Sequence, residues 1–418
     1  MDYASVNFFS DRAVQDDPYP YYDWLREQGP VWQEPRYGIY MVSGYEEALG
    51  VYRNPEDFSS CNTVAGPFTK WPVPLEGDDI SAIIEEYRDQ LPFSDQLPSF
   101  DPPRHTAHRA LMMRLLTPKR LAENEEFMWR LADRQLDELL AKGECEFISQ
   151  YAGPFTLLVI AELEGVPESD FGKFQSHFGQ LMGSGPMTHK PLEFLYEQFT
   201  DYIEDRRRNP RADIMTGMAT ATFPDGSVPD VQDVALIAAN LFAGGQETTV
   251  RLLSFALRML GEREDLQKRL RDERDRIPNF IDETLRLESP LRGQFRLARR
   301  RVRVGAVEVP PGGNVLLLPG AANRDPREFP DPDAFDVERP NARRHLAFGH
   351  GTHLCAGASL ARAEGRVTVN RLFDRTSDLA ISESVHGSAD SRKYDYLPTY
   401  LFRGLVSLHV ELSPKGSR

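Results

Sequence analysis

Cysteine is scarce in this sequence, since Cys61, Cys145 and Cys355 are the only three among 418 residues. An odd and sparse set excludes a disulfide framework and is typical of a reducing compartment. The chain also lacks any run of 18 apolar residues, so we expect no membrane-spanning helix. Residues 1–7 lack the basic-then-apolar pattern of a signal peptide. These absences predict a soluble, cytoplasmic protein that does not associate with membranes.

Positive charge is in deficit as well. The sequence contains 49 Lys and Arg against 64 Asp and Glu, which gives a net charge of −15. This balance argues against DNA or RNA as a general partner, because nucleic-acid binding depends on basic surfaces that neutralise phosphates. The length allows a large core and is compatible with one long domain or with two.

Glycine punctuates the stretch around the third cysteine, residues 348–357, which reads Phe-Gly-His-Gly-Thr-His-Leu-Cys-Ala-Gly. Glycine suits a chain that must turn tightly and approach another group closely. Residues 356–364 read as the start of a helix, so a thiolate at Cys355 would lie near the positive end of a helix dipole. An anionic sulfur is a metal ligand and donates electron density strongly to iron. The pattern therefore indicates a metal or cofactor site at Cys355.

Three other interpretations of this stretch deserve comparison. Cys355 could be a small buried hydrophobic residue, the commonest role of a lone cysteine. His350, His353 and Cys355 could bind zinc, although a tetrahedral site needs a fourth ligand. A dinucleotide-binding fingerprint is excluded, because Gly349 and Gly351 are not followed by the required third glycine.

Helical periodicity dominates much of the chain. Helices are predicted at 21–28, 45–53, 121–140, 151–163, 231–262 and 278–288, with two more within 168–208 that are joined at 183–186. Short strands are predicted at 38–43, 302–309 and 315–318, with a turn and strand at 398–405. Segment 61–104 is rich in proline and aromatic residues, which indicates either a binding wall or a mobile surface loop.

The helix predicted at 231–262 is apolar on nearly all sides, yet its centre contains Gly244, Gly245, Glu247, Thr248 and Thr249. An interior glycine costs roughly 1 kcal/mol relative to alanine, and a threonine hydroxyl can bond to a carbonyl one turn earlier and bend the helix. Local conflicts of this kind tend to mark functional sites. The alternative is a glycine pair tolerated where two helices cross.

Two pairs of charged residues share helix faces. His105 and Arg109 are four residues apart and could bind an anion, although such a pair is also common on solvated surfaces. Glu283 and Arg286 are three residues apart and could form an ordinary surface ion pair.

Taken together, these features resemble the cytochrome P-450 superfamily, and its soluble bacterial members in particular. Phe348, Gly351, Cys355 and Gly357 are similar to the family's Phe-x-x-Gly-x-x-x-Cys-x-Gly motif. The resemblance extends from about residue 17 to the C-terminus. It implies a mainly α structure, with residues 1–418 forming a single domain of the triangular prism type with a small β-rich region.

The resemblance also implies a cofactor, heme b (iron protoporphyrin IX). Cys355 would supply the thiolate ligand of the iron, with Phe348 packed beside the sulfur. The residues that resemble the binders of the heme propionates are His105, Arg109, Arg296 and His353. Glu283, Arg286 and Arg339 resemble a structural triad that locks the coil before the cysteine loop.

Glu247 and Thr248 resemble the family's acid–alcohol pair, which implies that they relay protons during catalysis. The family's substrate-contacting positions form a mainly apolar set. In this sequence they are Phe93, Ala239, Ala243, Leu291, Phe295, Tyr400 and Leu401.

The function that this resemblance implies is a heme-thiolate monooxygenase. It would insert one oxygen atom of O2 into an apolar small molecule by hydroxylation, epoxidation or O-demethylation, and it would act as a monomer. Electrons would come from a ferredoxin and an NAD(P)H-dependent ferredoxin reductase. Basic residues that could attract an acidic ferredoxin, or could equally be solvated surface, are Arg114, Lys119, Arg120, Arg343 and Arg344.

Two alternatives share the same fold. One is a peroxide-driven peroxygenase, against which the retained Glu247–Thr248 pair argues. The other is a heme-binding sensor or carrier without turnover, although the sequence contains no appended signalling domain.

Overall fold

The computed structural model describes residues 2–181 and 190–416. The chain divides into two compact units, each assembled from three separate stretches. The first unit comprises Met1–Ala107, Leu285–Cys355 and Leu397–Arg403, and the second comprises His108–Thr284, Ala356–Tyr396 and Gly404–Arg418. The joint predicted at 183–186 lies outside the described residues.

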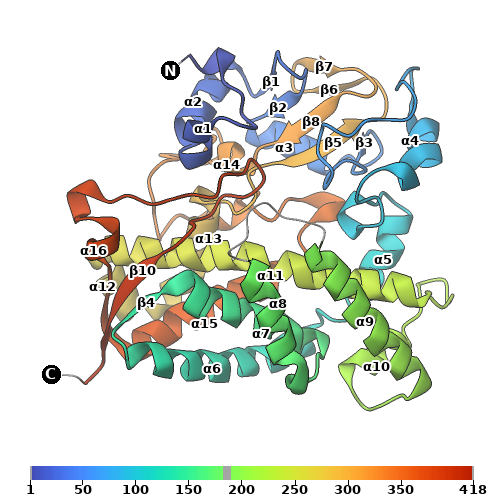
Figure 1. The fold of residues 1–418 in the computed structure, drawn as a ribbon. Helices are drawn as coiled ribbons and strands as arrows, with labels where there is room; N and C mark the ends of the chain where they lie inside the picture. The colour runs from blue at the N-terminus through green and yellow to red at the C-terminus, as the bar shows by residue number, and fades with distance from the viewer. Residues whose placement is uncertain (1, 182–189, 417–418) are drawn as a thin grey trace. The chain divides into compact units, whose positions relative to one another are not determined.

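The first unit contains a five-stranded sheet with the strand order β1-β2-β8-β5-β3, near the top of Figure 1. Its strands are β1 (Val31–Gln33), β2 (Tyr40–Val42), β3 (Phe58–Ser59), β5 (Gln294–Ala298) and β8 (Asn314–Leu317). Only β2 and β8 run parallel. The three residues Val315–Leu317 of β8 are all buried, as expected for a central strand with both faces covered. A separate hairpin joins β6 (Val302–Val304) to β7 (Val307–Val309).

Short helices surround this sheet. They are α1 (Arg12–Asp16), α2 (Tyr19–Gln28), α3 (Tyr45–Tyr52), α4 (Ser81–Tyr87) and α14 (Pro319–Ala322), with 3-10 turns at Tyr3–Ser5, Arg88–Gln90, Leu97–Ser99, Ala342–Arg344 and Gly351–His353. Helix α2 buries Tyr21, Tyr22 and Leu25, which share one face because a turn takes 3.6 residues. These side chains join Phe295 and Leu316 of the sheet in one apolar cluster.

The second unit is mainly helical. Its helices are α6 (Pro118–Leu140), α7 (Gly153–Glu164), α8 (Phe171–Leu181), α9 (Lys190–Arg208), α10 (Ile214–Ala219), α11 (Val231–Glu262), α12 (Glu264–Asp272), α15 (Ala358–Arg375) and α16 (Glu383–His386), with a π-helical turn at Ile148–Ala152 and 3-10 turns at Glu168–Asp170, Arg274–Arg276 and Ala389–Ser391. A three-stranded antiparallel sheet has the order β4 (Glu144–Glu146), β10 (His409–Pro414), β9 (Thr376–Ile381). Helices α5 (Arg104–Met112) and α13 (Ile277–Leu287) contribute residues to both units.

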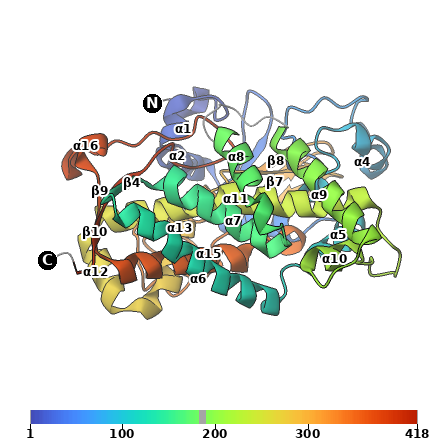
Figure 2. The ribbon, with the colours of Figure 1, turned by 60° about the horizontal axis from the view of Figure 1, so that its bottom comes forward.

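Helix α11 is the longest helix of the described chain, and it packs against α7 and α9 in both views (Figures 1 and 2). The Asp230 carboxylate caps its start by accepting a 2.7 Å hydrogen bond from the Asp233 amide. Its bounds, Val231–Glu262, confirm the helix predicted from the apolar periodicity.

The strand predicted at 398–405 is wrong. In the described chain this segment makes only isolated bridges, between Leu291 and Phe402 and between Tyr396 and Leu405. Because Phe402 and Leu405 pair with different stretches of the chain, no continuous ladder of strand hydrogen bonds forms along the segment. The C-terminal strand instead begins at His409.

Candidate active site

The cysteine loop belongs to the first unit, and its thiol is exposed whereas Cys61 and Cys145 are buried. The interpretation of Cys355 as a buried hydrophobic residue is therefore wrong. The Cys355 amide donates to the Phe348 carbonyl at 2.9 Å and closes the loop. The sequence thus folds into a turn that leaves the cysteine side chain at its surface.

Two glycines make this turn possible. Gly349 and Gly351 have φ angles of +65° and +68°, in the left-handed region that residues with a Cβ rarely occupy. A Cβ at Gly351 would also lie 2.3 Å from the Tyr52 carbonyl oxygen. Close backbone approach, and not only flexibility, therefore requires glycine at residue 351.

The zinc interpretation is not supported. Within residues 2–181 and 190–416, no group of three or more His, Cys, Asp or Glu side chains could hold a metal ion. His353 faces Ser60, with 3.0 Å between Nε2 and the serine oxygen. Burial, and to a smaller extent Arg53, lower the pKa of His350.

Arg296 is a buried cation, with 3% of its surface exposed. Its guanidinium donates to the Thr63 hydroxyl at 2.8 Å and to the Phe295 carbonyl at 2.6 Å, and both acceptors are neutral. Burial lowers the pKa of Arg296, and no carboxylate is paired with it within the described part of the chain. A buried guanidinium without an anionic partner is costly, so this site fits the carboxylate of a bound group such as a heme propionate.

His105 and His353 lie together, with 4.1 Å between their ring centroids. The turn that begins at Ser60 holds both His353 and Arg296, because Ser60 contacts His353, Thr63 contacts Arg296, and the Thr63 amide donates to the Ser60 carbonyl at 2.9 Å. The first unit therefore collects three of the four predicted anion-binding residues around one turn.

Hydrogen bonds to Asp101 hold this turn in place. Its carboxylate accepts from the Ser60 amide at 2.8 Å and from the side chains of Arg88 and Arg299 at 2.5 and 2.6 Å. Sequence reasoning missed Asp101, Ser60 and Thr63. They lie in or beside the proline-rich segment, where no periodicity marks a side chain.

Arg109, the fourth predicted residue, belongs to the second unit and is half-buried. It follows His105 by four residues in helix α5, so the two share a face of that helix. The adjacent His108 places its Nε2 3.1 Å from an oxygen of Asp233, in the first turn of α11.

Two of the three residues predicted to form a structural triad, Arg286 and Arg339, bind irregular backbone. Arg286 is fully buried and donates to the carbonyls of Asn323, Pro332 and Ala334 at 2.9, 2.6 and 3.0 Å. Arg339 also donates to Ala334, at 3.0 Å, so both arginines share one carbonyl. Glu283, three residues before Arg286 in α13, is fully buried. The coil that leads to the cysteine loop is thus held through its backbone.

The second unit presents a short polar stripe on α11. Ala243, Glu247 and Thr248 are half-buried and Gly244 is exposed, whereas the flanking positions Leu241, Phe242, Thr249 and Val250 are buried. Ala243, Gly244, Glu247 and Thr248 are spaced by three or four positions, so they lie on one face of the helix. The Thr248 hydroxyl donates to the Gly244 carbonyl at 2.8 Å, which confirms the predicted bond to the preceding turn.

Glu247 is not isolated on this stripe. Arg251, one turn later, donates to its carboxylate. Sequence reasoning missed Arg251, although the spacing of four residues was a readable signal. Gln246, between the glycines and the acid, is buried.

The predicted substrate-contacting residues divide between the units. Phe93, Leu291, Phe295, Tyr400 and Leu401 belong to the first unit, and Ala239 and Ala243 to the second. Phe93 has a φ of +59°, an uncommon conformation for a bulky residue. Phe295 and Ala239 are buried, Phe295 against the rings of Phe9 and Tyr400, whereas the other five residues are half-buried.

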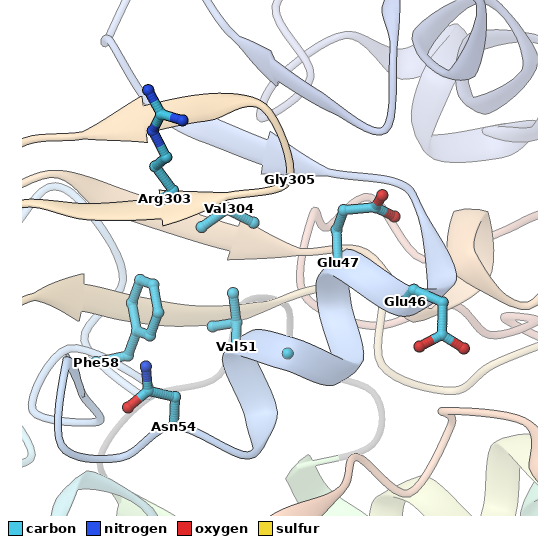
Figure 3. A pocket seen from close by; sticks show the side chains of 9 residues that line it. Glu46, Glu47, Val51, Asn54, Phe58, Arg303, Val304 and Gly305 are labelled. Carbon is cyan, nitrogen blue, oxygen red and sulfur yellow. The ribbon is translucent and has the colours of Figure 1, made fainter.

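Figure 3 shows a different hollow, a pocket of about 330 Å³ between α3 and the β6–β7 hairpin. It is lined by Glu46, Glu47, Gly50, Val51, Asn54, Phe58, Arg303, Val304 and Gly305. None of the predicted site residues lines it. Glu47 is engaged by Arg327 at 2.7 Å, so this carboxylate has a structural partner.

Comparison with known proteins identifies the fold. The family model described as Cytochrome P450 matches residues 172–377. Cytochrome P450 144 of Mycobacterium tuberculosis is 32% identical, over 96% of this chain and 90% of that protein. The structure of Mycobacterium marinum cytochrome P450 CYP150A6 in the substrate-free form is 52% identical with a TM-score of 0.95, covering 99% of this chain and 100% of that one. CYP109E1 from Bacillus megaterium in complex with testosterone is 25% identical with a TM-score of 0.78, covering 94% and 99%.

The fold and the cysteine loop thus define an oxidoreductase of the heme-dependent monooxygenase class. The chain belongs to the cytochrome P450 family and has its fold. Among the described helices, none combines the length and apolar character that crossing a bilayer would require.

Proposed function

We propose that this protein is a heme-thiolate monooxygenase that inserts one oxygen atom of O2 into an apolar small molecule and reduces the other to water. The observation that carries this proposal is the exposed Cys355 on a loop that turns at the left-handed Gly351 and is closed by the Cys355–Phe348 backbone bond, since these three residues stand at positions of the family's motif. When bound, heme b supplies the activation of O2 at an iron to which the thiolate donates electron density.

The first unit offers residues that suit this cofactor. The Cys355 sulfur would be the iron ligand, and Phe348 would pack beside it. Arg296, His353 and His105 would bind the propionates, with Arg109 as a further partner. Arg296 supports this assignment most directly, since its buried guanidinium donates to neutral acceptors alone within the described residues.

The polar stripe of α11 would handle protons. Glu247 is half-buried and can exchange protons with solvent, and the Thr248 hydroxyl can accept a hydrogen bond while it donates to Gly244. Gly244 adds no side chain to this face, and a Cβ there would meet nothing within 4 Å, whereas Gly245 lies against Ile160 of α7. The pairing of acid and alcohol favours O2-dependent turnover over a peroxide-driven reaction and over a sensor without turnover.

An apolar substrate is supported by the half-buried Phe93, Leu291, Tyr400 and Leu401, since small-molecule sites are lined mainly by apolar and aromatic side chains. The strained backbone of Phe93 adds support, because such outliers gather at ligand sites. Testosterone, which the similar CYP109E1 binds, is a reasonable first probe. Hydroxylation, epoxidation and O-demethylation are all compatible with an apolar substrate.

A ferredoxin and its NAD(P)H-dependent reductase would supply the electrons. Of the basic residues suggested for docking, Lys119, Arg343 and Arg344 are exposed. Lys119 and Arg120 are paired with Glu123, and Arg344 is paired with Glu328. We further propose that the chain acts as one catalytic domain, as a monomer and in the cytoplasm. Single-domain behaviour is supported by the fact that each unit is assembled from three separate stretches.

The carbon monoxide difference spectrum of the reduced, purified protein tests the proposal. A strongly red-shifted Soret band is expected, since an anionic sulfur ligand produces it, and Cys355→Ala should abolish it while Cys145→Ala should leave it unchanged. A protein that binds no heme, or a band that survives Cys355→Ala, would overturn the assignment. Titration with testosterone and with charged sugars, followed by the Soret shift, then tests the apolar pocket.

A further inference from the structure

Arg251 stands out on helix α11 because it is more buried than the acid it binds. Its side chain is 6% exposed, against 26% for Glu247. One terminal nitrogen of the guanidinium donates to the Glu247 carboxylate, four residues earlier in the helix. The arginine thus reaches the carboxylate from the protein side and not from solvent.

The C-terminal segment of the second unit anchors the other end of the guanidinium. The second terminal nitrogen donates to the Leu405 carbonyl at 3.1 Å. A Cβ on the preceding Gly404 would lie 2.2 Å from Cδ and 2.7 Å from Nε of Arg251. The φ of Gly404 is not left-handed, so glycine is needed at this position because a larger side chain would clash with Arg251. The segment is itself tied back by the bridge between Leu405 and Tyr396.

Another arginine on the same helix, Arg258, serves for comparison. It lies ten residues beyond Thr248, is 3.8 Å from Glu262 and donates to the Tyr396 hydroxyl at 2.7 Å, away from the polar stripe. Arg251 differs in its partner, since it donates to the carboxylate of the stripe itself, and its Nε is buried without a hydrogen-bond partner within the described chain. A buried charge with an unsatisfied donor is a poor device for stability alone, and such local conflicts tend to be kept for function.

We propose that Arg251 is a positioning residue that holds the Glu247 carboxylate beside Thr248, with Gly404 and Leu405 as its fixed support. The inference rests on the proposed function, in which Glu247 relays protons. Protonation of Glu247 weakens its bond to the guanidinium and frees the carboxyl group to turn, and loss of the proton restores the pair. Arg251 thereby returns the acid to one place after each transfer.

Three variants, with two controls and one reference, separate this role from a structural one. Arg251→Gln removes the charge, Arg251→Lys keeps the charge without the two-pronged guanidinium, and Gly404→Ala displaces the arginine without changing it. The matched controls are Arg258→Gln on the same helix and Gly217→Ala, since a Cβ at Gly217 meets nothing within 4 Å. Glu247→Gln serves as the reference for a lost relay.

The first measurement needs no turnover. In protein labelled with ¹⁵N at arginine, a guanidinium held at both ends rotates slowly and gives separate terminal NH signals, and the Arg251 signal is assigned by its absence in Arg251→Lys. We expect this signal to change in Glu247→Gln and Gly404→Ala and to persist in Arg258→Gln and Gly217→Ala. A signal unaffected by Glu247→Gln would overturn the pairing.

The second measurement uses the heme-loaded enzyme with excess ferredoxin, reductase and NADH, without added substrate. We expect hydrogen peroxide released per NADH to rise by about 3- to 10-fold in Arg251→Gln and Gly404→Ala, with partial recovery in Arg251→Lys, because a misplaced acid delivers protons late. The ratio of NADH consumption in H2O and D2O should change in the same order.

If Glu247→Gln leaks peroxide and Arg251→Gln does not, the positioning role is wrong and the proposed function stands. If Glu247→Gln itself behaves like the unmodified protein, the proton relay in the proposed function fails and the inference fails with it. Equal leaks from Arg258→Gln and Arg251→Gln would also overturn the inference, because they would indicate a general weakening of the helix.

Discussion

The two units hold their candidate functional residues by opposite means. In the first unit the site lies on irregular backbone, whose carbonyls accept hydrogen bonds from buried arginines and whose turns depend on glycine. In the second unit it lies on one regular helix, α11, whose backbone satisfies its own hydrogen bonds. Side chains in the first unit are therefore committed to holding the chain, whereas those on the polar stripe of α11 remain available for chemistry.

This comparison leads to an expectation about substitutions. Changes in the coil and cysteine loop should lower the free energy of unfolding, because buried backbone groups lose their partners. Changes on the α11 stripe should alter the reaction with little effect on stability.

Arg286→Ala should cost the most. It leaves the carbonyls of Asn323 and Pro332 without their side-chain donor, and the Ala334 carbonyl keeps only the bond from Arg339. We expect a loss of about 3 kcal/mol or more in the free energy of unfolding by urea. The exposed Arg344→Ala, which breaks a 3.0 Å pair with Glu328, should cost about 1 kcal/mol or less. Equal losses would refute the view that the coil depends on its buried arginines.

Gly351→Ala should cost about 2 kcal/mol or more in the unfolding of the heme-free protein, because alanine disfavours a left-handed φ. The added methyl group would also meet the Tyr52 carbonyl at 2.3 Å. Gly357→Ala is the control, since a Cβ there meets nothing within 4 Å and its φ is −84°. Stability that is the same for both variants would mean that the loop relaxes around residue 351.

The sequence allowed prediction of the two units to different extents, for the same physical reason. The bounds of α11 follow from local signals, an apolar period and the Asp230 cap. The polar stripe is equally local, and Arg251 could have been found by its spacing from Glu247. Ser60 and His353, in contrast, are 293 residues apart, and no local pattern reports that they meet. Residues of the cysteine loop were found through a family motif, and their partners Ser60, Thr63 and Asp101 carry no motif.

Arg296→Leu should weaken heme binding without destabilising the heme-free protein. The Arg296 guanidinium donates to neutral acceptors only, so burying its charge lowers the stability of the heme-free protein. Leucine removes this burial cost and also removes the group that would bind the propionate. We expect transfer of heme to apomyoglobin to be about tenfold faster, since a charged hydrogen bond contributes about 1.5–3 kcal/mol. Arg300→Leu, which breaks a half-exposed 3.1 Å pair with Asp57, is the control. Unchanged heme retention would remove Arg296 from the propionate site.

Thr248→Ala should have the smallest effect on the fold and a selective effect on the reaction. Alanine is a better helix former than threonine, and the Gly244 carbonyl that accepts from Thr248 lies on the exposed part of the stripe, so the free energy of unfolding should change by about 0.5 kcal/mol or less. Peroxide released per NADH should rise about threefold, because the hydroxyl no longer passes protons inward. Thr248→Ser keeps the hydroxyl and should restore most of the coupling. If Thr248→Ala instead destabilised the protein as much as Gly351→Ala does, the stripe of α11 would have a structural role. The proposed difference between the two units would then be wrong.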